Sequence, residues 1–216
     1  MPARLILVRH GETAWSASGQ HTGRTDIPLT EEGREMARRV GVRLANAPWN
    51  GLPDARVYTS PLSRARETAE LAGFGARAVD RPELLEWDYG QYEGRTGVEI
   101  REHDNPGWLI WRDGVPGGEK ISEVAARVDA FLADVAADHG TPHPETTTMH
   151  AADCDVVVFA HGHLLRILAA RWLGLAPEYG QRLKLGTAAL SVLSWEYGAP
   201  AIEIWNDHSH LDGLGA

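Results

Sequence analysis

Residues 5–13 read Leu-Ile-Leu-Val-Arg-His-Gly-Glu-Thr, an apolar run that ends directly in a fixed cation, a titratable ring and a glycine. A short, continuous apolar run is typical of a strand buried on both faces of a sheet. Ligands of open α/β sheets bind beyond the carboxyl ends of the strands, so Arg9 and His10 are expected where a ligand arrives. On these residues alone, a surface Arg-His pair after a core strand stays an open alternative.

Strand and helix patterns alternate along the rest of the chain. Apolar runs predict buried strands, and apolar positions at helical spacing predict helices, the first of them capped by Thr30. Strands are expected at residues 5–8, 56–59 and 156–160, helices after Thr30 and at 63–71, 121–135 and 164–172, and a closing hairpin at 189–195 and 201–205. This order predicts an α/β fold, a three-layer sandwich with a mostly parallel central sheet and helices on both faces.

Length and composition narrow the class of protein. At 216 residues and 43% hydrophobic content, the chain is expected to form a single domain over residues 1–216. No run approaches the roughly 20 apolar residues of a membrane span, and the N-terminus has no signal-peptide pattern, so we expect a cytoplasmic protein without a membrane partner. Cys154 is the only cysteine, which excludes an internal disulfide. The net charge of −9 argues against nucleic acid as a partner but permits a locally positive cleft.

Three further segments supply chemistry that matches residues 9–11. They read Thr-Ser-Pro-Leu-Ser-Arg-Ala at 59–65, Leu-Leu-Glu-Trp-Asp-Tyr-Gly at 84–90, and Phe-Ala-His-Gly-His at 159–163. Together the four motifs resemble those of the histidine phosphatase superfamily, the group that includes cofactor-dependent phosphoglycerate mutase. The resemblance runs from Leu5 to about Leu193 and is closest to the branch of sedoheptulose-1,7-bisphosphatase and small acid phosphatases. It implies a fold like that of phosphoglycerate mutase.

The resemblance also implies a role for each of five polar residues. His10 is the implied nucleophile, since a neutral imidazole is competent at pH 7 and divides hydrolysis into two displacements. Arg9 and Arg64 are expected to bind the phosphate in fork geometry, and His161 to donate to it. Glu86 is the expected general acid, which protonates the leaving oxygen.

The general acid and His161 each have an alternative assignment on the sequence alone. Asp88 and Glu93 are alternative general acids, although acids at such positions are more often solvated or structural. His161 and His163 are alternatively two metal ligands, but no carboxylate cluster stands near them in the sequence, so neither a metal nor another cofactor is expected.

The residues implied to contact the rest of the substrate are drawn from several segments. They are Ser16, His21, Thr22, Tyr89, Gly162 and Arg166. Arg166 is a candidate to hold a second phosphate or sugar hydroxyls, with Arg112 as a second candidate. The alternative for Arg166 is a helix arginine paired with a surface acid.

The function implied is that of a metal-independent phosphatase acting through a phosphohistidine on a small phosphorylated metabolite, a sugar phosphate or sugar bisphosphate being favoured. The segment 90–118 is shorter than the lid of the mutases, so water is expected to reach the phosphohistidine. A cofactor-dependent phosphoglycerate mutase and a non-catalytic phosphate-binding regulator are the alternatives. An exposed edge strand and the pairing of relatives favour a homodimer. Residues 138–153, without periodicity, are expected to form a surface loop.

Overall fold

The structure, a computed structural model, describes residues 4–139 and 154–213. Its strands are β1 (Leu5–Arg9), β2 (Arg56–Thr59), β3 (Ala78–Asp80), β4 (Val156–Ala160), β5 (Leu190–Glu196) and β6 (Ala199–Asp207). Its helices are α1 (Ala14–Ser18), α2 (Glu31–Ala45), α3 (Ser63–Leu71), α4 (Gly97–His103), α5 (Ile110–Asp113), α6 (Ile121–His139) and α7 (Gly162–Trp172). Within these described ranges, no helix is long and apolar enough to cross a membrane.

The strands form one mixed sheet in the order β3-β2-β4-β1-β5-β6. Strands β3, β2, β4 and β1 pair in parallel, whereas β5 runs antiparallel to both β1 and β6. The predicted mostly parallel sheet is confirmed. Because β1 and β4 are neighbours, Arg9 lies opposite Ala160 and the His10 N–H donates to the Ala160 carbonyl at 2.9 Å. The motifs at residues 9–11 and 159–163 are therefore adjacent in space.

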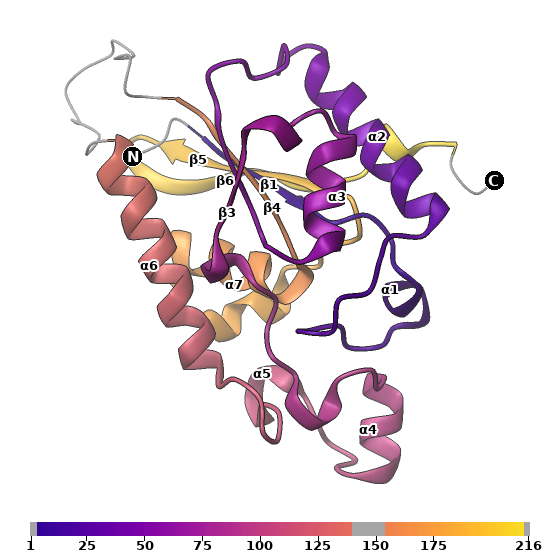
Figure 1. The fold of residues 1–216 in the computed structure, drawn as a ribbon. Coiled ribbons are helices and arrows are strands. Elements are labelled where there is room, and N and C mark those ends of the chain that lie inside the picture. Colours follow the sequence, from indigo (N-terminus) through magenta and orange to yellow (C-terminus); the bar gives the residue numbers. More distant parts are fainter. Residues whose placement is uncertain (1–3, 140–153, 214–216) are drawn as a thin grey trace.

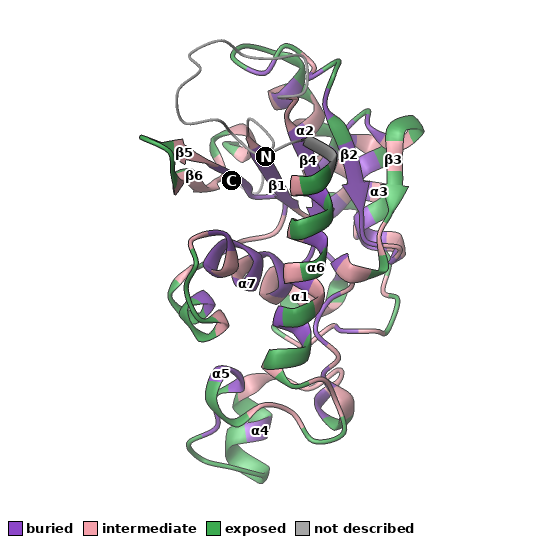
Figure 2. Ribbon diagram, turned by 90° about the vertical axis from the view of Figure 1, so that its left-hand side faces the viewer, coloured by how far each residue is buried: buried purple, intermediate pink, exposed green. Residues whose placement is uncertain are grey.

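Helices cover both faces of this sheet, as the sequence predicts (Figure 1). Along β1, Leu5 and Leu7 join the core cluster that contains residues of α6 and α7, whereas Ile6 and Val8 join the cluster beneath α2 and α3. This alternation is the period of two that a strand imposes. The strands and the inner faces of the helices are buried, and the outer face of α6 is exposed (Figure 2).

A close approach of two backbones fixes the loop after β1 against the start of α2. Thr30 caps α2, its side chain accepting from the Gly33 N–H at 2.9 Å. A Cβ on Gly11 would lie 2.3 Å from the Gly33 carbonyl oxygen, and one on Gly33 would lie 2.1 Å from the Glu12 carbonyl oxygen. Only residues without a Cβ allow this contact, which holds the His10 loop in place.

Two boundaries differ from the prediction. Helix α6 continues to His139, so the first two residues of the predicted loop 138–153 are helical; residues 140–153 lie outside the described residues. The predicted hairpin forms, but its turn is only two residues long, with Tyr197 and Gly198 at φ 49° and 78°. Positive φ at both positions is what a tight hairpin turn requires, so β6 starts earlier, at Ala199.

Candidate active site

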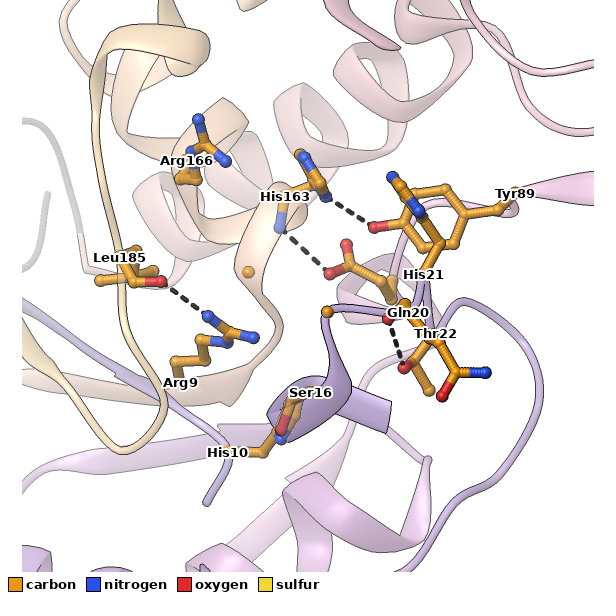
Figure 3. A pocket seen from close by; sticks show the side chains of 13 residues that line it. Arg9, His10, Ser16, Gln20, His21, Thr22, Tyr89, His163, Arg166 and Leu185 are labelled. Carbon is orange, nitrogen blue, oxygen red and sulfur yellow. Dashed lines mark hydrogen bonds between the residues drawn. The ribbon is translucent and has the colours of Figure 1, made fainter. Parts of the chain in front are cut away.

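A cavity of about 180 Å³ opens beyond the carboxyl ends of β1 and β4 (Figure 3). Nine of the predicted site residues line it: Arg9, His10, Ser16, His21, Thr22, Glu86, Tyr89, Gly162 and Arg166. Gly19, Gln20, His163 and Leu185 complete the lining and are not among the predicted residues. The position agrees with the expectation that ligands bind beyond the strand ends.

His10 is held as a neutral imidazole with one nitrogen available. Its Nδ1 lies 2.7 Å from the Gly11 carbonyl oxygen. Since a carbonyl only accepts, Nδ1 carries the proton and Nε2 keeps its lone pair. Burial, followed by the positive charges of Arg64 and Arg9, holds the pKa of His10 well below its usual range. The ring therefore stays unprotonated at neutral pH, as a nucleophile requires.

Arg9 has donors in this cavity that the protein leaves unused. One Nη donates to the Leu185 carbonyl at 2.7 Å, while the buried Nε–H has no hydrogen-bond partner among the described residues. A buried donor without a partner is costly, and a phosphate oxygen is an acceptor that would satisfy it. A Cβ on Gly162 would lie 3.3 Å from the Arg9 guanidinium carbon, so glycine at this position leaves room for the arginine.

Arg64 and His161 lie behind the cavity instead of lining it. Both are fully buried, and the ring centroid of His161 lies 5.2 Å from that of His10. The Arg64 Nε–H donates to His161 Nδ1 at 3.2 Å, so the His161 proton is on Nε2, which lies 2.7 Å from the Ser60 hydroxyl oxygen. Burial and the charge of Arg64 keep the pKa of His161 well below its usual range.

The Nη atoms of Arg64 hold the loop that follows α1. They donate to the carbonyls of Thr22, Gly23 and Thr25 at 2.9–3.1 Å. From the other side, the Glu93 carboxylate accepts from the N–H groups of Gly23 and Thr25 at 2.7 and 3.1 Å. In this structure Arg64 therefore positions the loop that carries Thr22 into the cavity.

The Glu86 carboxylate is buried and fixed in orientation. One oxygen accepts from the N–H groups of Trp87 and Leu164, both at 2.9 Å, and the other accepts from the His163 N–H at 3.0 Å. His163 and Leu164 lie in the first turn of α7, where backbone N–H groups and the helix dipole attract a carboxylate. The carboxylate thus lies in the same cavity as His10.

The two rival acids lie outside the cavity lining. Glu93 anchors the loop described above, and an Asp88 carboxylate oxygen accepts from the Gly90 N–H at 2.9 Å. Both carboxylates bind backbone N–H groups away from the cavity, whereas Glu86 is among the residues that line it.

Rings form the wall opposite Arg9. The Tyr89 hydroxyl lies 2.6 Å from His163 Nδ1, and the ring of His21 is parallel to that of His163 at 6.3 Å. Burial lowers the pKa of both histidines and, with the charge of Glu86, raises that of Tyr89, so this wall is neutral. The sequence signal that identifies His163 as a site residue is the repeated histidine of the run His161-Gly162-His163 at the start of a helix.

Arg166 contributes a cation to the side of the cavity away from His10 (Figure 3). Its guanidinium donates to the carbonyls of Gly180 and Gln181 at 3.0 and 3.1 Å and lies 4.6 Å from the ring centroid of Trp111. Arg112, the other second-phosphate candidate, is exposed, pairs with Asp113 and does not line the cavity.

Comparison with known proteins gives the family. The sequence profile of the histidine phosphatase superfamily (branch 1) matches residues 5–208. The chain is 37% identical over 213 residues to an acid phosphatase of Mycobacterium tuberculosis, a match covering 99% of this chain and 97% of that protein. It is 38% identical over 193 residues to the sedoheptulose 1,7-bisphosphatase of Saccharomyces cerevisiae, covering 81% and 69%.

Solved structures agree with the sequence matches. The fold superposes with a TM-score of 0.82 on the structure of an open reading frame product of Mycobacterium tuberculosis, at 36% identity and covering 95% of this chain and 98% of the other. The resemblance stated from the four motifs is therefore confirmed. The chain belongs to branch 1 of the histidine phosphatase superfamily, and it is an enzyme of the phosphatase type.

Proposed function

We propose that the enzyme hydrolyses a small phosphorylated sugar or sugar acid that carries a second anionic group, a sugar bisphosphate being the favoured case. The observation that carries this proposal is one cavity lined by two guanidinium groups, those of Arg9 and Arg166, neither of which forms an ion pair within the described residues. Glu86 is the one acidic side chain among the described residues that line this cavity, so two cations face one carboxylate, and in a chain of net charge −9 this local positive excess favours an anionic ligand.

The chemistry proposed for the first step uses His10 and Glu86. His10 Nε2 attacks phosphorus in line, the bond between phosphorus and the ester oxygen breaks, and Glu86 gives its proton to the departing alcohol oxygen. Arg9 stabilises the charge on the transferring phosphoryl oxygens through the donors that the protein leaves unused.

The second step reverses the role of the carboxylate. Water attacks the phosphohistidine, Glu86 takes a proton from that water, and the bond between nitrogen and phosphorus breaks to release inorganic phosphate. His161 accepts a hydrogen bond from Arg64 and lies behind His10, and from this position it acts on the electrostatics of the site.

Cavity size supports a small substrate. Its volume of about 180 Å³ is below the range of about 300–1,000 Å³ typical of drug-sized ligands. The neutral wall of His21, Tyr89 and His163 offers hydrogen-bonding groups to sugar hydroxyls, while Trp108 meets the His21 ring edge-on at 5.4 Å.

The test measures phosphate release in EDTA from sugar monophosphates, sugar bisphosphates, phosphoglycerates and an aryl phosphate. We expect turnover without metal and a preference for a sugar substrate that carries a second anionic group. Arg166→Gln should raise KM for the bisphosphate about tenfold or more, because one charge-assisted hydrogen bond is lost. It should change KM for the aryl phosphate by less than about threefold.

Arg112→Gln is the matched control, because Arg112 belongs to α5, the helix whose Trp111 contacts Arg166, but lies outside the cavity. Equal changes for mono- and bisphosphates in Arg166→Gln would contradict a second anion site. Isomerisation of phosphoglycerates without net phosphate release would contradict hydrolysis itself.

A further inference from the structure

Arg127 of helix α6 makes a set of contacts that the chemistry above does not use. One Nη donates to the carbonyls of Glu83 and Leu85 at 2.7 and 2.5 Å, and the other donates to the carbonyl of Glu86 at 3.2 Å. These carbonyls belong to the irregular segment that carries the general acid. A side chain from α6 thus holds a stretch of backbone that no strand ladder supports.

Glu119 binds both Arg127 and the far end of the same segment, at Trp87 and Asp88. Its two carboxylate oxygens accept from Arg127 Nε at 2.9 Å and Nη at 3.1 Å. The same carboxylate accepts from the Asp88 N–H at 2.9 Å, and the Glu119 carbonyl accepts from the Trp87 indole N–H at 2.8 Å. Burial raises the pKa of Glu119, but the hydrogen bonds and charge of Arg127, together with the Asp88 N–H and the charge of Arg24, outweigh burial and lower this pKa.

The number of contacts matches the number of donors. A guanidinium has five N–H groups in a fixed plane, and Arg127 makes five hydrogen bonds to these acceptors. A lysine has three donors on a single nitrogen and cannot reach acceptors spread along the fork of the guanidinium. The site is therefore specific for arginine.

Neither partner of this pair lines the cavity, and their side chains are 15% and 18% exposed. Among the described residues, the hydrogen bonds of Arg127 reach the site only through Glu119 and the backbone of residues 83–88, while its charge also acts on His161. We propose that Arg127, held by Glu119, is the positioning residue for the general acid: it sets where the Glu86 carboxylate stands relative to the leaving oxygen. This inference rests on the proposed role of Glu86 in hydrolysis.

The geometry implies a defined kinetic effect. The N–H groups of α7 hold the Glu86 carboxylate, while Arg127 holds the Glu86 carbonyl, so both ends of the residue are fixed. A displacement of about 1 Å in a catalytic group can reduce the rate about 100-fold. Such a loss should appear only where the leaving group needs a proton.

The test compares Arg127→Lys with wild type on a sugar phosphate and on an activated aryl phosphate. We expect kcat for the sugar phosphate to fall about 100-fold, kcat for the aryl phosphate to fall less than about threefold, and KM for both to stay within about twofold. Glu119→Gln, which keeps the shape of the side chain, should also lower kcat for the sugar phosphate more than kcat for the aryl phosphate, but by a smaller factor.

Two controls separate positioning from damage to the fold. Arg171→Lys changes an arginine that links α7 to Asp129 of α6. It should leave kcat and KM for both substrates unchanged. In a Glu86→Gln background, Arg127→Lys should cause no further loss on the sugar phosphate, because the group it positions has lost its function.

Four outcomes overturn this inference. Equal losses on both substrates would make Arg127 a structural residue only, as would a further loss in the Glu86→Gln background. Unchanged kinetics in Arg127→Lys would show that the contacts are not needed. A wild-type enzyme that releases no phosphate from any ester would instead overturn the proposed function and this inference with it.

Discussion

Lowering the pH from 7.5 to 5.5 should destabilise the protein through its buried histidines, of which His10 and His161 are two. Both rings are at least 96% buried, and burial holds their pKa well below the usual 6.5 in the folded state. In the unfolded chain both rings protonate as the pH falls through about 6.5, so the unfolded state binds more protons. The stabilisation is therefore complete above pH 6.5 and is lost below it.

The magnitude follows from the linkage relation. For one ring that stays neutral in the folded state throughout this interval, the loss of stability between pH 7.5 and 5.5 is about 1.4 kcal/mol, and for both rings it is about 2.7 kcal/mol. Carboxylates contribute mainly below this interval, since their reference pKa values lie near 4. His163, whose pKa burial also holds well below its usual range, adds a contribution of the same sign, and a single substitution isolates the contribution of one ring.

Urea unfolding of wild type and His161→Gln at pH 7.5, 6.5 and 5.5 measures this contribution. The variant should lose about 1.4 kcal/mol less than wild type over the interval, whatever its absolute stability. His103→Gln, which changes an exposed histidine on α4, is the control and should keep the wild-type pH dependence. An unchanged pH dependence in His161→Gln would refute the reasoning.

Three further changes test the site and the fold. His10→Ala should abolish acid-labile labelling by a radioactive phosphate ester, and persistent label would remove His10 from the nucleophile's role. Glu86→Gln should slow sugar phosphates about 10²- to 10⁴-fold and aryl phosphates far less, and an equal loss on both would contradict a general acid. Gly11→Ala should cost about 1–3 kcal/mol in urea unfolding, because its Cβ would meet the Gly33 carbonyl, whereas Gly107→Ala, whose Cβ meets only a side chain at 3.8 Å, should cost much less.

The buried strands and the long helices could be predicted because their patterns are strong. The runs that become β1 and β4 are mainly apolar and β2 has the apolar centre Val57-Tyr58, and Thr30 caps α2 as its position before two acidic residues indicates. Helix α1 and strand β3 have only five and three residues and show no periodicity. Short elements like these depend on tertiary contacts, which a single sequence does not display.

The residue types of the site were predictable, but their partners were not. Ser16 lines the cavity as expected, yet its hydroxyl also accepts from the Thr13 N–H at 2.8 Å in the cap of α1. Arg64 bonds carbonyls about 40 positions earlier in the chain, a pairing that only the folded loop creates. The role of the residues in catalysis, the single domain, the homodimer and the cytoplasmic location stay predictions.

The cavity takes its two sides from different parts of the chain, and this has an evolutionary consequence. Arg9 ends β1 and His10 follows it, whereas Trp108 and Trp111, which pack against the rings of the opposite wall, belong to residues 97–113, the segment that carries α4 and α5 and comes after Glu86. Insertions or exchanges in that segment leave the sheet and the strand-end residues unchanged. Substitutions in this peripheral segment can thus change which substrate fits the cavity while Arg9, His10 and Glu86 stay in place, so specificity can diverge without loss of the residues proposed for catalysis.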